Sequence, residues 1–297
     1  MHELKKRIPI LGLLFTTLVA SAGEPVYQLN AKKDMALSAT GMMLCGMPLL
    51  SNQTRFYHRS ELASLQTEKL WWPGLDKKAH LNWSLSADRI STIIPFGMAV
   101  VVGALPWTLA NERDGKGGTW TQARTIYTMY MEAWLIQAGI KSMIKTLVNR
   151  PRPFLFNPSY STEDKLLRAE KGGKDSFISG HTSGAFMTAA FVSTVLMHTS
   201  EKKHIRWIAL ALAGAATVTA VQRYRSGDHY PTDILTGAFT GTLTGILVPA
   251  LHLSGRQAVD LRTGIQYPDG YAPVYTLGLN MSLTTAFNGR HSITISK

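Results

Sequence analysis

Long apolar segments without charged residues recur along the chain and are separated by polar connections. Residues 90–109 and 234–253 each contain 20 positions without Asp, Glu, Lys or Arg, enough for a helix to cross a hydrocarbon core about 30 Å thick. Residues 182–198 and 205–221 are shorter and rich in small residues, as close packing between membrane helices requires. These segments predict a helical bundle in a membrane, although the two shorter ones also suit buried helices of a soluble protein.

Two further segments extend the pattern. Residues 126–148 form an apolar segment that contains Glu132, Lys141 and Lys145. Ionisable groups inside such a helix are costly unless they face a polar cavity, so this helix is predicted to carry functional groups. Residues 35–50 are marginal in length for a span, and we expect them to be interfacial or re-entrant. The predicted fold class is all-α, a membrane-embedded bundle of five or six helices.

The two ends of the chain differ from this body. Residues 1–22 combine a basic start, an apolar run from Ile8 to Val19 and the sequence Ala20-Ser21-Ala22, which predicts a secretory signal cleaved after Ala22 rather than an uncleaved anchor. From Val274 the sequence alternates, and Asn288-Gly289 precedes another short alternating run, which indicates a hairpin. The expected organisation is a signal peptide at 1–22, an N-terminal region at 23–89 that suits a membrane interface or ordinary loop packing, a helical core at 90–253 and a small C-terminal β appendage at 254–297.

Composition narrows the classes of function. The chain is 45% apolar and 17% charged, and its mean hydropathy is zero, which excludes intrinsic disorder. A single cysteine, Cys45, excludes an intrachain disulfide and a cysteine-cluster metal site. The net charge of +12 favours an anionic partner. Nucleic acid, an acidic membrane surface and a phosphorylated substrate all satisfy that condition.

The first cluster of candidate functional residues lies at the end of the 126–148 helix. Lys145 is followed by the sequence Arg150-Pro151-Arg152-Pro153. Proline cannot continue a helix, so Arg150 and Arg152 are predicted to lie on an extended exit from it. Taken alone, these charges also suit a positive flank that only orients the helix.

The second cluster is Ser179-Gly180-His181, directly before an apolar helix. Ser179 suits the N-cap, Gly180 permits close backbone approach, and the free N–H groups of a first helical turn attract anions. His181 would then lie beside the bound anion as a proton donor. A capped helix with an incidental histidine is the simpler interpretation of this cluster in isolation.

The third cluster runs from Arg223 to Asp233. Pro231 suits the first position of a helix, so Asp233 would lie early in that helix and reach back to the ring of His229. A carboxylate on one imidazole nitrogen leaves the other free to attack. Arg223 offers two parallel N–H donors to a phosphate. Asp228, beside His229, either pairs with Arg225 or alters the pH dependence.

In this order and spacing, the three clusters resemble the type 2 phosphatidic acid phosphatase superfamily, which includes bacterial acid phosphatases and vanadium haloperoxidases. The resemblance implies that His229 is a nucleophile forming a phosphohistidine, that Asp233 orients it, and that His181 is the acid for the leaving group. It implies that the phosphate is bound by Lys145, Arg152, Ser179, Gly180 and Arg223. It also implies that neither a cofactor nor a metal is needed. Ile178 and Gln222 replace a usual proline and serine, which concerns loop rigidity rather than chemistry.

Charge also predicts orientation. Three Lys or Arg residues lie between 201 and 206, which places this connection in the cytoplasm. The active site would then face the periplasm of a bacterial-type inner membrane. We expect a membrane-associated phosphatase acting on a lipid phosphate or diphosphate, without nucleic acid as a partner and with its oligomeric state open. The alternatives are a soluble periplasmic acid phosphatase, a vanadium-dependent haloperoxidase and a non-catalytic basic membrane binder. A final sequence feature is a basic loop that contains Lys165, Arg168, Lys171 and Lys174. It is predicted to be solvated, and contact with a second phosphate of the substrate is the alternative.

Overall fold

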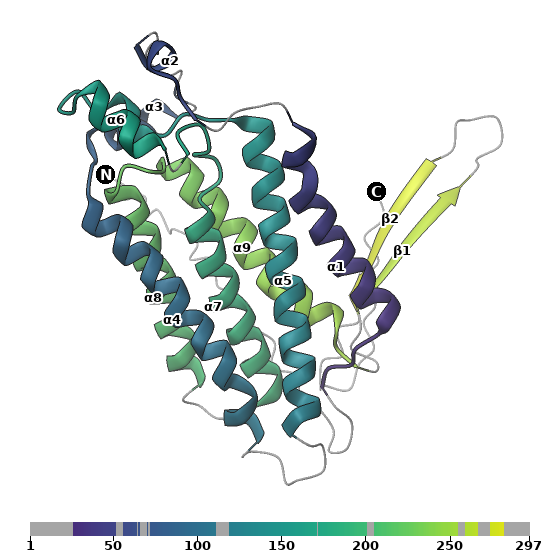
Figure 1. The fold of residues 1–297 in the computed structure, drawn as a ribbon. Helices are drawn as coiled ribbons and strands as arrows, with labels where there is room; N and C mark the ends of the chain where they lie inside the picture. The colour runs from purple at the N-terminus through teal and green to yellow at the C-terminus, as the bar shows by residue number, and fades with distance from the viewer. Residues whose placement is uncertain are drawn as a thin grey trace, which may run out of the picture.

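A computed structural model describes residues 26–51, 56–63, 65, 70, 72–110, 119–170, 172–200, 205–254, 259–266 and 274–281. Long helices run side by side and short helices gather at one end (Figure 1). The long helices are α1 (Ala31–Gly46), α4 (Leu85–Ala110), α5 (Thr119–Val148), α7 (Gly180–Thr199), α8 (Ile205–Arg225) and α9 (Pro231–Leu251). The short ones are η1 (Met47–Leu50), α2 (Arg59–Ala63), α3 (Pro73–Asp76), η2 (Lys77–Leu81), η3 (Pro153–Phe156) and α6 (Thr162–Ala169).

Helix α7 lies at the centre of the bundle and contacts α4, α5, α8 and α9. Its closest neighbour is α9, which presents Gly237, Gly241 and Gly245 at four-residue intervals. A Cβ atom at Gly241 would lie 2.1 Å from the carbonyl oxygen of Ser183, and one at Gly245 would lie 2.3 Å from that of Met187. The absence of side chains therefore lets the two backbones touch, as small residues do in membrane bundles.

The outer faces of the bundle are apolar. Three of the described helices are long and apolar enough to cross a membrane: Leu85–Leu109, Ile205–Arg225 and Pro231–Leu251. In the most apolar stretch of each helix, no more than a third of the residues are buried inside the protein. Large apolar side chains are exposed on these helices at Ile93, Phe96, Val100, Leu210, Val218, Val221, Leu235, Phe239, Leu243 and Leu247. The predicted segments 126–148 and 182–198 also form helices, α5 and α7, but do not meet the same criterion.

Helix α1 lies along α5 within the bundle. A Cβ atom at Gly41 would lie 2.7 Å from the backbone of Leu135, and one at Gly139 would lie 2.6 Å from Cβ of Leu44. The segment before α1 joins the far end of α9, because the backbone N–H of Ser254 donates to the carbonyl of Val26 over 3.0 Å. The 21 residues of α9 correspond to a helix about 30 Å long, so α1 starts at the opposite end of the bundle from Pro231.

Strands β1 (Val259–Gln266) and β2 (Val274–Met281) pair in antiparallel register, with Val259 opposite Met281. The predicted Asn288-Gly289 turn, the run after it and the signal segment 1–22 lie outside the described residues. The run from Val274 was predicted to pair across that turn, whereas its described partner is β1. A β appendage separate from the helical body stays a prediction.

Candidate active site

The site begins where α5 ends. Asn149 has a φ of 48°, in the left-handed region, and the two prolines that follow it keep the next residues extended. This extended segment lies against the loop before α7. The N–H of Arg152 donates to the carbonyl of Gly173 over 2.9 Å, and the N–H of Ser176 donates to the carbonyl of Arg150 over 3.0 Å. Residues two apart in an extended segment usually share a face, but Arg150 and Arg152 have different partners.

Arg150 faces the interior. Its side chain is 1% exposed and forms ion pairs with Asp76 at 3.1 Å and Asp233 at 2.6 Å. It also donates to the hydroxyl of Thr232 over 2.9 Å and lies 3.8 Å above the ring of Tyr230. The extended segment after α5 was predicted to expose Arg150. In the structure Arg150 is buried and links α3 to α9. No sequence feature marks Asp76, 74 positions away, as its partner.

Arg152 and Lys145 meet the same carboxylate. Nε of Arg152 donates to Asp175 over 2.9 Å, and Nη1 donates to Asp228 over 2.7 Å. Nζ of Lys145 donates to the carbonyl oxygen of Asp175 over 2.6 Å and lies 3.4 Å from its carboxylate. Burial opposes ionisation of Asp175, but the positive charges of Arg152 and Lys145 outweigh it and lower the pKa of Asp175 to about 2.

Arg223 lies near the end of α8 and is almost fully buried. It donates to Asp88 over 2.5 Å and to the hydroxyl of Ser91 over 3.2 Å, and its Nη2 lies 3.2 Å from Asp228. Its Nε–H has no hydrogen-bond partner among the described residues. Asp228 therefore meets Arg223 and not Arg225, the partner considered from the sequence. Burial opposes its ionisation, but the surrounding arginines hold the pKa of Asp228 far below its usual range.

Arg168 joins this network from α6. Its Nη2 donates to the carbonyl of Ser226 over 2.6 Å and to Asp228 over 3.3 Å. Its guanidinium lies 4.5 Å from the ring centre of Trp83 and 4.8 Å from that of Phe154. The prediction of a solvated loop residue is wrong for Arg168, because the amphipathic helix α6 turns it inward. Its Nη1 has no hydrogen-bond partner in the described part of the chain.

His229 lies in the turn between α8 and α9 and is 1% exposed. Its Nδ1 lies 2.6 Å from the carbonyl oxygen of Ser176. A carbonyl only accepts, so Nδ1 carries a proton and, in the neutral ring, Nε2 keeps its lone pair. The Asp233 carboxylate is 3.8 Å from Nδ1 and accepts instead from the Ser176 hydroxyl over 2.5 Å and the Tyr230 N–H over 2.8 Å. Asp233 therefore accepts a hydrogen bond from Ser176, and the carbonyl of Ser176 orients His229. The sequence predicted a direct contact of Asp233 with the His229 ring, and Ser176 makes the short contact instead.

The turn that carries His229 depends on glycine. Gly227 has a φ of 79°, in the region that side chains disfavour. A Cβ atom there would also lie 2.2 Å from the carbonyl oxygen of Asn82. The N–H of Phe154 donates to the carbonyl of Gly227 over 2.9 Å, which attaches the turn to the segment after α5.

Ser179 occupies the N-cap position of α7, as predicted, but its hydroxyl contacts the hydroxyl of Thr182 over 2.8 Å and makes no capping bond to the backbone. Its N–H donates to the carbonyl of Asp233 over 3.1 Å, which joins the starts of α7 and α9. Gly180 lies against Lys141, since a Cβ atom there would lie 2.8 Å from Cδ of that lysine.

Both histidines lie in one positive field. Burial and then the charge of Arg223 lower the pKa of His181 to about 4, with smaller contributions from Arg152 and Lys145. Burial and the same three cations hold the pKa of His229 well below its usual value. The tertiary structure therefore brings together residues from all three sequence clusters around two neutral imidazoles.

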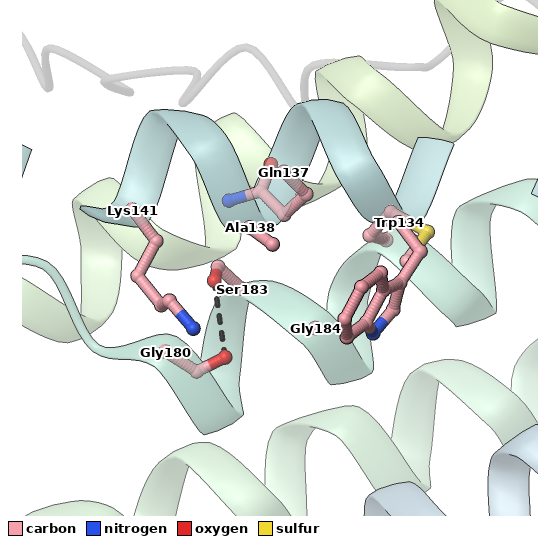
Figure 2. A pocket seen from close by; sticks show the side chains of 8 residues that line it. Trp134, Gln137, Ala138, Lys141, Gly180, Ser183 and Gly184 are labelled. Carbon is pink, nitrogen blue, oxygen red and sulfur yellow. Dashed lines mark hydrogen bonds between the residues drawn. The ribbon is translucent and has the colours of Figure 1, made fainter. Parts of the chain in front are cut away.

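A pocket opens beside this site, between α5 and α7 (Figure 2). Lys141 and Gly180 lie at one end, and Trp134 and Gly184 lie further along the two helices. Ser183 donates to the carbonyl of Gly180 over 3.1 Å, so its hydroxyl is directed back toward the start of α7. The remaining lining residues are Gln137, Ala138 and Met187.

Residues 126–255 match the model of the PAP2 superfamily, which confirms the resemblance found from the motifs. This stretch contains every residue predicted for the site. The fold is similar to the first transmembrane PAP2 type phosphatidylglycerolphosphate phosphatase from Bacillus subtilis, with 18% identity, a TM-score of 0.42 and coverage of 73% of this chain and 94% of that one. It is also similar to Aquifex aeolicus LpxE, with 22% identity, a TM-score of 0.38 and coverage of 58% and 90%. No curated protein sequence matches the chain.

Proposed function

We propose that this protein is a membrane phosphatase that hydrolyses a lipid phosphate or diphosphate through a phosphohistidine on His229. One observation carries the proposal. The buried ring of His229 has its proton held on Nδ1 by the carbonyl of Ser176, beside a buried cluster of cations. Nε2 is then available to attack phosphorus, and phosphoryl transfer mainly requires positioning and positive charge around the transferred oxygens.

The cations support this role because part of their hydrogen-bonding capacity is unused. Nε of Arg223 and Nη1 of Arg168 are buried donors without partners among the described residues, and a buried unsatisfied donor carries a cost of about 1–3 kcal/mol. Phosphoryl oxygens would accept from both. In this proposal the phosphate is bound by Lys145, Arg152, Ser179, Gly180 and Arg223, and Arg168 joins them through its Nη1.

The reaction proceeds in two transfers. Nε2 of His229 bonds to phosphorus as the bond to the leaving oxygen breaks, and His181 gives that oxygen its proton. Water then attacks phosphorus, His181 takes the proton from the water, and the bond to Nε2 breaks. His181 has a pKa of about 4 without substrate, and a phosphate beside it raises that pKa because its negative charge offsets the cations.

A lipid substrate is supported by the pocket and by the exposed apolar helices. The pocket extends from Gly180 along two helices of the bundle, so a headgroup at the start of α7 can continue into an apolar chain beside α5. Phosphatidate, phosphatidylglycerol phosphate, undecaprenyl diphosphate and lipid A are all compatible with this arrangement.

We place the protein in a bacterial-type inner membrane with the active site toward the periplasm. The basic connection at 201–206 would then be cytoplasmic. Because α1 starts at the end of the bundle away from the site, Val26 would also be cytoplasmic if α1 crosses the membrane, which disagrees with cleavage after Ala22 outside the cell. A periplasmic reporter fused after Lys202 is expected to be inactive, and activity would reverse the orientation. The boundaries at residues 89 and 253 remain part of the proposal, whereas cleavage after Ala22 agrees only with the opposite orientation.

The first experiment measures phosphate release from detergent-dispersed phosphatidate, phosphatidylglycerol phosphate, undecaprenyl diphosphate and lipid A. It compares wild type with His229→Ala and His58→Ala. Loss of the nucleophile should reduce kcat by at least about 10³-fold. His58 is an exposed histidine directly before α2, so its replacement should leave activity unchanged. Release that survives His229→Ala would contradict the phosphohistidine mechanism. Bromide oxidation that requires vanadate would favour a haloperoxidase.

A second experiment separates a lipid phosphatase from a soluble acid phosphatase. A Cβ atom at Gly184 meets nothing within 4 Å, so Gly184→Leu should fold and fill the pocket. We expect it to lower kcat/KM for a long-chain lipid phosphate at least tenfold and to spare p-nitrophenyl phosphate. Gly97→Leu, at an equally open position on α4, is the matched control. Equal losses on both substrates in Gly184→Leu would oppose chain binding in the pocket.

A further inference from the structure

A second cluster of ionisable side chains lies away from the phosphatase site. Asp34 is in the first turn of α1, Glu132 is in the middle of α5, and His252 directly follows α9. His252 is fully buried, Glu132 is 1% exposed, and the side chain of Asp34 is 15% exposed. None of the three has a role in phosphoryl transfer, because α9 separates them from His229 by most of its length.

The separations within the cluster suit a metal ion. Nε2 of His252 lies 3.1 Å from Oδ1 of Asp34 and 3.2 Å from Oε2 of Glu132. One ligand atom from each residue lies within 4.8 Å of the others. Ligands about 2.0–2.1 Å from a tetrahedral zinc ion are about 3.3 Å apart, so two sides of the triangle already have this length.

The second nitrogen of His252 fixes the orientation of its ring. Nδ1 lies 2.8 Å from the carbonyl oxygen of Val248, one turn earlier in α9. Because the carbonyl only accepts, Nδ1 is protonated, and Nε2 faces the two carboxylates. A neutral ring would turn its Nε2 lone pair toward two carboxylates, so either a proton shared among the three groups or a metal ion must lie there. Histidines that bind a metal ion through one nitrogen almost always donate the other N–H to a carbonyl, a carboxylate or water, as His252 does to Val248.

Glu132 distinguishes these two possibilities. Neither of its carboxylate oxygens has a hydrogen-bond partner in the described part of the chain, and Oε2 only approaches His252 as an ion pair. An Nε2–H that points at Asp34 leaves Glu132 with only the 3.2 Å approach to the same nitrogen. Lys33 directs its ammonium group to the carbonyl of Leu251 over 2.7 Å. A buried carboxylate left in this state is costly, and binding a metal ion is one of the ways in which proteins offset that cost.

We propose that Asp34, Glu132 and His252 bind one divalent transition metal ion, and that Zn²⁺ fits this site best. One imidazole and two carboxylates are ligands that zinc accepts. The ion joins α1, α5 and α9 and strengthens the attachment of the segment before α1, where the N–H of Gln28 donates to the carbonyl of His252 over 2.8 Å. Its role is structural.

The test uses the full-length protein in detergent, stripped with a chelator, dialysed and titrated with Zn²⁺. Calorimetry and elemental analysis should give one tightly bound zinc per chain, and zinc should raise the melting temperature. Glu132→Gln and His252→Gln should weaken zinc binding at least tenfold and abolish that increase. His58→Gln, which removes an exposed histidine, should bind zinc as wild type does.

Two results would overturn the proposal. The first is stripped wild type that binds no zinc tightly, which would mean that a proton rather than a metal ion occupies the site. The second is equal binding by wild type and every cluster variant, which would place the zinc elsewhere. If a buried variant fails to fold, Asp34→Asn at the partly exposed ligand tests zinc binding by the cluster in its place. The visible absorption of Co²⁺ bound to wild type tests the same site without a substitution. All these measurements are independent of phosphatase activity.

Discussion

Replacement of Arg150 by methionine tests the buried network beneath the proposed nucleophile. The side chains of Arg150, Asp76 and Asp233 are at most 1% exposed, and the guanidinium is the common partner of both carboxylates. Methionine fills a similar volume without charge and strands two buried acids. Removing one partner of a buried ion pair typically costs about 3–5 kcal/mol. We expect Arg150→Met to lose that much unfolding free energy, whereas Arg124→Met at an exposed position of α5 should change it by less than about 0.5 kcal/mol.

Unfolding free energies measured by denaturant titration in mixed micelles would test this expectation. A double-mutant cycle with Asp76→Asn then isolates the pair, because the double variant strands one carboxylate fewer than Arg150→Met. A coupling energy of about 0.5–3 kcal/mol is expected for contacting groups. A loss below about 1 kcal/mol in Arg150→Met, or additive losses in the cycle, would refute a dry ion-pair network at this position.

Three further predictions follow from the loops around the site. Gly227→Ala should cost at least about 1–3 kcal/mol of stability and most of the phosphate release, because of the positive φ and the 2.2 Å approach to a carbonyl; wild-type stability would contradict the geometry of this turn. The folded protein resists protonation of His181 until about pH 4, whereas the unfolded chain takes up that proton near pH 6.5. This group should therefore lower stability as the pH falls from about 6.5 to about 4, and histidine NMR should show the ring neutral at pH 7 and its pKa raised by bound phosphate. Asp228→Asn should tighten inhibition by inorganic phosphate about tenfold or more while lowering stability, since it frees Arg152 and Arg223 to bind the anion; unchanged inhibition would mean that Asp228 does not compete with phosphate.

The residues of the proposed site could partly be recognised from the chain because its main chemical groups lie in short local patterns. Ser179, Gly180 and His181 are consecutive, and proline at 231 marks the start of the helix that holds Asp233. A pattern of this kind reports the order of the groups and the helix ends that carry them. It does not report partners from distant parts of the chain, such as Asp88 for Arg223, 135 positions away.

The misjudged residues share this cause. Arg150 and Arg152 look equivalent in sequence, and only the pairing of their segment with residues 173–176 turns one toward Asp233 and the other toward Asp228. Arg168 looks like a surface charge until α6 packs beside Trp83.

The sequence by itself determined the helical character of the body, the positions of the apolar helices and the set of histidines and cations at their ends. These features follow from local periodicity, helix-breaking residues and residue type, which depend on neighbours a few positions away. The tertiary structure decided which cation meets which carboxylate, which carbonyl orients His229, and that Asp34, Glu132 and His252 lie together. Those outcomes depend on how separate helices pack, because desolvation and short ion pairs arise only once distant segments exclude water between them.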